Sequence, residues 1–136
     1  MKRFTTSLAL VLVGPFLSMA QLAVTVSSPT LIGQKAVVPL ALKNEFTQTI
    51  TSARAAVFVS DERGKVVGPA TRWVIGGDPG KPGLEPKATN AFHFVITSSK
   101  PLESTNLTAK VVFTRLVLED GKSVDPKKNV VVKEGK

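Results

Sequence analysis

Residues 53–68 read Ala-Arg-Ala-Ala-Val-Phe-Val-Ser-Asp-Glu-Arg-Gly-Lys-Val-Val-Gly, and this stretch decides the fold class. Alternate positions share one side of an extended chain, which places four apolar side chains together: Ala53, Ala55, Val57 and Val59. A helix over Ser52–Val59 is an alternative because alanine favours helices. The β-branched and aromatic residues near Val59, and the turns on both sides, favour a strand. Asp61-Glu62-Arg63-Gly64 then supplies a hairpin turn and Lys65–Gly68 the return, so the stretch predicts a β-hairpin.

The same pattern of strands and turns extends in both directions from this hairpin. Short runs of alternating apolar residues are separated by turn residues, without an internal repeat, a dividing linker or a convincing helix after residue 20. The other expected strands are Leu22–Val26, Val38–Leu42, Thr71–Ile75, Ala88–Thr97, Leu107–Leu118 and, after an interruption at Pro126, Val130–Val132. The sequence therefore predicts an all-β fold, a single immunoglobulin-like β-sandwich of about seven strands over residues 21–136.

Three local features refine this expectation. Leu107–Leu118 is apolar on both faces, which favours a central strand, and Asp120-Gly121 after it predicts a tight turn with a return from Lys122. Pro39 has no N–H to donate, so its strand is expected to have an edge or a bulge there. The Gly- and Pro-rich segment 76–83 predicts a long surface loop.

Three segments resemble a known class of module: Val38–Asn44, Val57–Gly68, and Leu84-Glu85-Pro86 followed by Phe92-His93-Phe94. Together, over residues 36–97, they are similar to FxLYD-type domains, small bacterial extracytoplasmic immunoglobulin-like modules. The chain departs from that pattern with Val57, Val59 and Ser60 where the family motif has Phe, Leu and Tyr, and with Pro86-Lys87 where Pro-Gly is common. The resemblance implies the sandwich fold, a place outside the cytoplasm and a non-catalytic role.

The first twenty residues have the three-part order of a secretory signal peptide. Met1-Lys2-Arg3 is basic, residues 8–17 are apolar, and Ser18-Met19-Ala20 offers small residues to a signal peptidase. Cleavage between Ala20 and Gln21 would export the protein to the periplasm or the exterior and leave no transmembrane segment in the mature chain. A buried N-terminal helix and an uncleaved signal anchor are the alternatives.

Composition excludes several chemistries. The 136 residues contain no Cys and one His, with a formal net charge of +8. The absence of Cys excludes disulfides, thiolate metal sites and Cys nucleophiles, and a single His excludes any His-pair metal motif, so no metal or cofactor is expected. His93 alternates with Phe92 and Phe94 and is expected to point away from their face. A Ser–His–Asp hydrolase built on His93 is the weakest alternative, because no Gly-x-Ser-x-Gly elbow presents a nucleophile.

Two groups of residues are candidates for binding. Residues 122–136 are rich in lysine, and Lys127, Lys128 and Lys133 would meet an anionic polymer or membrane surface, unless they only protect an edge strand. Arg72 and Trp73 together would form an interaction anchor, although a buried core Trp is the favoured reading in such sandwiches. No interleaved aromatics support nucleic-acid binding. The leading hypothesis is a non-catalytic domain that binds another envelope or secreted protein.

Overall fold

Eight strands and one short helix make up the described part of the chain, residues 21–98 and 106–135 of a computed structural model. The proposed signal peptide, including Ala20, lies outside the described residues. The elements are β1 (Leu22–Val26), β2 (Thr30–Ile32), β3 (Lys35–Asn44), β4 (Ile50–Ser60), β5 (Val66–Ile75), β6 (Thr89–Thr97), β7 (Thr108–Leu118), α1 (Pro126–Asn129) and β8 (Val130–Glu134). The all-β prediction is confirmed, although β2 is not among the expected strands.

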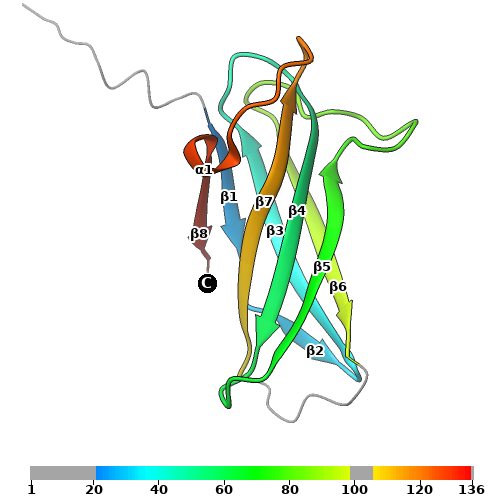
Figure 1. Cartoon of the computed structure of the whole chain (residues 1–136), viewed down its shortest axis with the longest axis vertical. Helices are drawn as coiled ribbons and strands as arrows, with labels where there is room; N and C mark the ends of the chain where they lie inside the picture. Colours follow the sequence, from blue (N-terminus) through cyan, green and yellow to red (C-terminus); the bar gives the residue numbers. More distant parts are fainter. Residues whose placement is uncertain (1–20, 99–105, 136) are drawn as a thin grey trace, which may run out of the picture.

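The strands form two sheets, with β7, β4 and β5 in front of β3 and β6 in the view of Figure 1. In the five-stranded sheet, β3 pairs with β6 on one side and with both β1 and β2 on the other, and β8 joins β1 in parallel. In the three-stranded sheet, β4 lies between β5 and β7, and both pairings are antiparallel.

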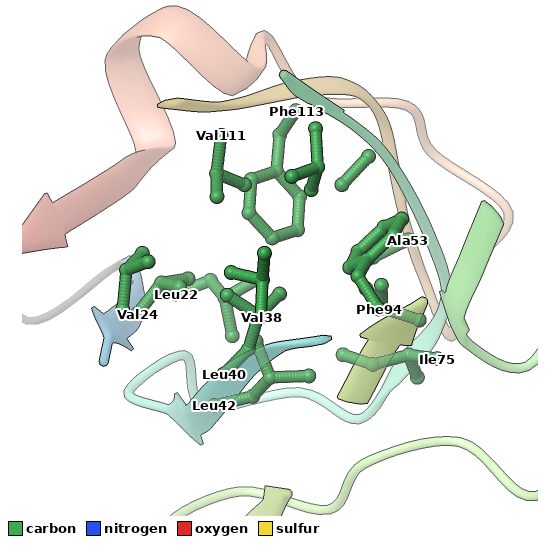
Figure 2. Packing of buried hydrophobic residues seen from close by; sticks show 14 of the residues in the cluster. Leu22, Val24, Val38, Leu40, Leu42, Ala53, Ile75, Phe94, Val111 and Phe113 are labelled. Atoms are coloured by element: carbon green, nitrogen blue, oxygen red, sulfur yellow. The ribbon is translucent and has the colours of Figure 1, made fainter. Parts of the chain in front are cut away.

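The core lies between the two sheets and follows from the alternation of apolar residues. Ala53, Ala55, Val57 and Val59 on β4 are all fully buried, as the opening hairpin predicts. They meet the inward side chains of β1 and β3, and Figure 2 shows Leu22, Val38, Leu40, Phe94 and Phe113 converging on the same space. Burial of this set is the main stabilising contribution, because apolar area removed from water is worth about 25 cal/mol per Å².

A β-bulge explains why β7 is apolar on both faces. Ala55 pairs with Phe113 and Arg54 with Arg115, so Thr114 is an extra residue in β7. The extra residue reverses which positions point inward. Val111 and Phe113 before it, and Leu116 and Leu118 after it, are therefore all buried. The expectation of a central strand is wrong: β7 is an edge of the three-stranded sheet, and β4 is its centre.

Two further local expectations are corrected. The segments around Val66 and Trp73 are one strand, β5, which continues through the Gly68-Pro69 bond. The return after Asp120-Gly121 makes only a single bridge to β7, and the chain then crosses to β1. The crossing includes α1, a single helical turn at Pro126 whose N-cap carboxylate, on Asp125, accepts from the Lys127 amide at 3.0 Å.

Pro39 lies inside a paired strand, between β6 on one side and the junction of β1 and β2 on the other. Its carbonyl accepts from the Ser27 amide at 3.0 Å, just past the end of β1. The missing N–H of Pro39 therefore falls at the gap between β1 and β2, where no ladder bond is lost. On this side β3 has no strand partner at Pro39 and is locally an edge, as expected, while its register with β6 is unbroken and without a bulge.

Asn44 joins the end of β3 to two loops. Its side chain is fully buried, and its amide nitrogen donates to the carbonyls of Leu84 (2.8 Å) and Gln48 (2.9 Å). Its amide oxygen accepts from the backbone N–H of Phe46 at 2.8 Å. All the strong hydrogen-bonding positions of this amide except one oxygen lone pair are thus used, which holds both loops to the sheet.

Candidate binding face

The outer face of the three-stranded sheet combines positive charge with aromatic surface. Arg54 on β4 and Lys110 and Arg115 on β7 are exposed there, beside a half-buried Trp73 on β5. The residues of β4, β5 and β7 include no Asp or Glu. We call these four residues the cationic face.

One cross-strand row runs through all three strands. Arg54 lies opposite Trp73 on one side and opposite Arg115 on the other. The Arg54 guanidinium carbon is 5.6 Å from the centre of the Trp73 ring, within range of a cation–π contact. Two like charges directly opposite each other destabilise a sheet by a few tenths of a kcal/mol. The row therefore maintains an unfavourable pair of charges that an anionic partner would neutralise.

The loop that follows β5 packs against Trp73 and holds its position. A Cβ added to Gly77 would lie 2.3 Å from Cγ of the Trp73 ring, so the backbone at Gly77 packs directly on the indole. Lys81 donates from Nζ to the Trp73 carbonyl at 2.9 Å, and the same ammonium lies 5.4 Å from the centre of the Phe92 ring. The favoured core position for Trp73 is wrong: its ring is on the outer side of the sheet, outside the buried cluster.

Apolar side chains continue the face along β4 toward the Asp61 turn. Ala56 is only 8% exposed although it points outward, because its neighbours shield it. Val112 beside it is 41% exposed, and Phe58 is half-buried. A shallow and mostly apolar groove follows, lined by Phe58, Ser60, Val66, Thr108 and Lys110. The face thus combines apolar area with an aromatic ring and two arginines, and aromatic residues and arginine are enriched in binding interfaces.

The other predicted binding residues are dispersed. Arg72 is exposed where the edges of β5 and β6 approach each other, and its guanidinium donates to the Thr71 carbonyl at 2.9 Å. Lys127 and Lys128 are exposed on α1, near β7, whereas Lys133 pairs with Thr25 and faces outward from the five-stranded sheet. The structure does not bring the C-terminal lysines together on one surface.

His93 is exposed on β6 and lies opposite Pro39, pointing away from the buried face as expected. Within residues 21–98 and 106–135, no three His, Asp or Glu side chains gather in a way that could hold a metal ion. The helical part of those residues is limited to one turn, so no described helix is long or apolar enough to cross a bilayer.

The sequence contained a signal for the cationic face that pattern reading missed. The lysines near the C-terminus lie close together in the sequence, so composition alone indicates a binding surface there. The absence of acids from three separate strands is equally visible, but it becomes a surface only when those strands are known to be neighbours.

Comparison with known proteins gives the fold and nothing finer. No family model matches the chain, and no curated protein is significantly similar to it. The Northeast Structural Genomics Consortium target SoR45 superposes with a TM-score of 0.57 at 14% identity, over 76% of this chain and 79% of that one. A candidate ApaA protein from Bordetella pertussis gives a TM-score of 0.55 at 18% identity, over 76% of this chain and 85% of that one.

Proposed function

We propose that this protein is an exported, non-catalytic binding domain that uses its cationic face to dock on an acidic surface of another envelope or secreted protein. The observation that carries the proposal is the Trp73–Arg54–Arg115 row, which places two arginines opposite each other on a sheet without acids. Arg and Trp are the residues most often found at the energetic centre of protein interfaces. None of the three cations of the face has a carboxylate partner in the described part of the chain.

The size of the face sets the expected strength of binding. Three strands about 4.8 Å apart, with ten residues rising about 3.3 Å each, present roughly 400 Å². A standard interface buries about 800 Å² on each partner, so this face by itself supports a weak and transient complex. Exposed charges would supply much of the attraction, and binding is expected to fall steeply with added salt.

The fold class proposed for this domain is immunoglobulin-like, as its resemblance to FxLYD-type modules suggests. The order β1-β3-β6 in one sheet and β5-β4-β7 in the other supports this, since immunoglobulin domains divide their strands in a similar way. The parallel pairing of β8 with β1, instead of with β7, is a departure from the constant-type arrangement.

Export is the second element of the proposal. Gln21, the first residue after the proposed cut, is held to the domain, because its side-chain amide donates to the Glu45 carboxylate at 2.8 Å, and β1 follows directly at Leu22. Protein recovered from the producing cells should begin at Gln21 when its intact mass is measured. A mass that includes residues 1–20 would contradict cleavage.

Binding is tested with poly(L-glutamate) as an acidic polypeptide probe, using biolayer interferometry at about 50 and 300 mM NaCl. The double variant Arg54→Gln/Arg115→Gln should weaken binding about tenfold at low salt and flatten its salt dependence. The double variant Lys127→Gln/Lys128→Gln removes the same charge elsewhere and is the matched control. If only the control variant loses binding, the site for the anionic partner is at the C-terminal lysines and the cationic face is excluded. If the protein binds anionic vesicles more tightly than polyglutamate, the partner is a membrane surface and not a protein.

A further inference from the structure

The edge strands of the two sheets are protected very unequally. β5 contains Pro69, β7 contains Lys110 and Arg115, and β8 is only five residues long and carries Lys133. β6 is nine residues long, Thr-Asn-Ala-Phe-His-Phe-Val-Ile-Thr, without Pro, Gly, Lys, Arg or an acid. Natural proteins normally blunt exposed edges with such residues, so an unprotected edge of this length indicates a pairing partner. Among the described strands, β6 pairs with β3 alone.

The position of Pro39 shows which backbone groups of β6 are free. The N–H and C=O of one residue point to the same side of an antiparallel strand, and the Pro39 carbonyl points to Ser27, away from β6. Pro39 and His93 are therefore a non-hydrogen-bonded pair, and the backbone groups of His93 point away from β3. The Ser98 amide donates to the Gln34 carbonyl at 2.8 Å, so the backbone groups of Ser98 point toward β3. The backbone groups of even-numbered residues of this segment therefore face β3, and those of odd-numbered residues face away from it.

The free groups of β6 are self-complementary about His93. Odd-numbered residues from Thr89 to Thr97 point their N–H and C=O to the open edge. In an antiparallel pairing of two copies centred on His93, Thr89 lies opposite Thr97, Ala91 opposite Val95 and His93 opposite its own equivalent. Each of these five odd-numbered pairs is then a hydrogen-bonded pair that exchanges two bonds, giving about ten inter-chain bonds. The pairing places no two like formal charges opposite each other within β6.

We propose that the protein forms a two-fold symmetric dimer in which β6 of one copy pairs antiparallel with β6 of a second copy, in the register centred on His93. The five-stranded sheets of the two copies become one continuous sheet. Val95, 44% exposed in the single chain, gains a cross-strand neighbour in Ala91 of the other copy. The cationic face lies on the other sheet and stays uncovered, so the dimer does not depend on the proposed function.

The neighbours of His93 make it a suitable point for a charge test. On the outer side of the sheet it is flanked by Ala91 and Val95 on its own strand and faces Pro39 on β3. The nearest cations on β3, Lys35 and Lys43, pair with Thr97 and Thr89 at the two ends of β6. Two further cations lie beside β6 from other elements: Arg72 lines the same pocket as Val95, and Lys81 Nζ is 5.4 Å from the centre of the Phe92 ring. A lysine at position 93 would place two ammonium groups opposite each other at the two-fold axis.

The test is sedimentation velocity of the full chain at 5–100 μM (about the range used for weak dimers), with far-ultraviolet circular dichroism to confirm folding. The wild type should give a sedimenting species whose mass is twice that of the chain. His93→Lys should be a folded monomer, as should Val95→Pro, which removes only an edge-facing N–H. Thr30→Lys, on the same side of the sheet but on β2, should remain a dimer. A monomeric wild type, or a dimer that survives both β6 variants, overturns the proposal.

A second measurement reports the register even if those variants fold poorly. The chain has no Cys, so His93→Cys carries a single thiol. In the proposed register its Cα lies about 5.5 Å from its equivalent, within the range that a disulfide spans. Copper-phenanthroline and oxygen should convert His93→Cys to a cross-linked dimer on a non-reducing gel, and Thr30→Cys should stay monomeric there. Equal cross-linking of the two variants, or none in His93→Cys, overturns the register.

Discussion

Replacement of Asn44 by alanine should remove about 4 kcal/mol from the free energy of unfolding. The substitution leaves the Leu84 carbonyl and the Phe46 amide buried without their partner, and each such group costs about 1–3 kcal/mol. The Gln48 carbonyl is less enclosed and adds a smaller loss. Small domains have about 5–15 kcal/mol of stability in total, so this loss is a large share of the free energy of unfolding.

Urea unfolding followed by fluorescence of Trp73, the only Trp in the chain, measures this loss. The free energy of unfolding falls by about 1.5 kcal/mol per M of urea, so the urea midpoint should fall by about 2–3 M while this slope stays unchanged. Gln34→Ala removes an exposed amide side chain and should change the free energy of unfolding by less than about 0.5 kcal/mol.

An isosteric variant separates hydrogen bonding from packing. Asn44→Asp keeps an acceptor for the Phe46 amide but turns the two donated bonds into contacts between oxygen atoms. It should be at least as destabilised as Asn44→Ala, although it leaves no cavity. If Asn44→Asp is close to the wild type, or if Asn44→Ala matches Gln34→Ala, the hydrogen-bond argument for this residue is refuted.

Two predictions concern the loop after β5. Gly76→Ala places a Cβ 1.9 Å from a carbonyl oxygen of β4 at a φ of +57°, so it should lower the urea midpoint by more than 1 M, whereas Gly121→Ala (φ +82°, open space) should lower it by about 0.5 M. A similar effect for the two variants would contradict the close approach. Gly77→Ala should displace the Trp73 ring, shifting its emission maximum in the folded protein, while Gly80→Ala, with no atom within 4 Å of its added Cβ, should leave the spectrum unchanged. An unshifted Gly77→Ala spectrum would show that this backbone does not hold the indole.

Local pattern predicted most strands, and its errors share one physical cause. Alternation correctly assigned the buried face of β4, because period-two patterning depends only on neighbouring residues. It misassigned β7 as central because a bulge at Thr114 reverses the alternation, and a reversed alternation looks the same as a strand buried on both faces. The Trp73 error has the same cause: Ala53 pairs with Ile75 and Arg54 with Trp73, so Val74 is an extra residue and Trp73 does not share the buried face of Ile75.

The amino-acid sequence by itself determined that this chain is a β protein, where its Asp61 hairpin turns and which strand faces are apolar, since these depend on contacts within a few residues. Only the tertiary structure decided which strands are neighbours. That choice places Arg54 between Trp73 and Arg115, separates Lys133 from Lys127 and leaves β6 as an unprotected edge. The physical reason is that surfaces and edges are made by residues far apart in the chain, whose meeting depends on how the two sheets bury their apolar faces together.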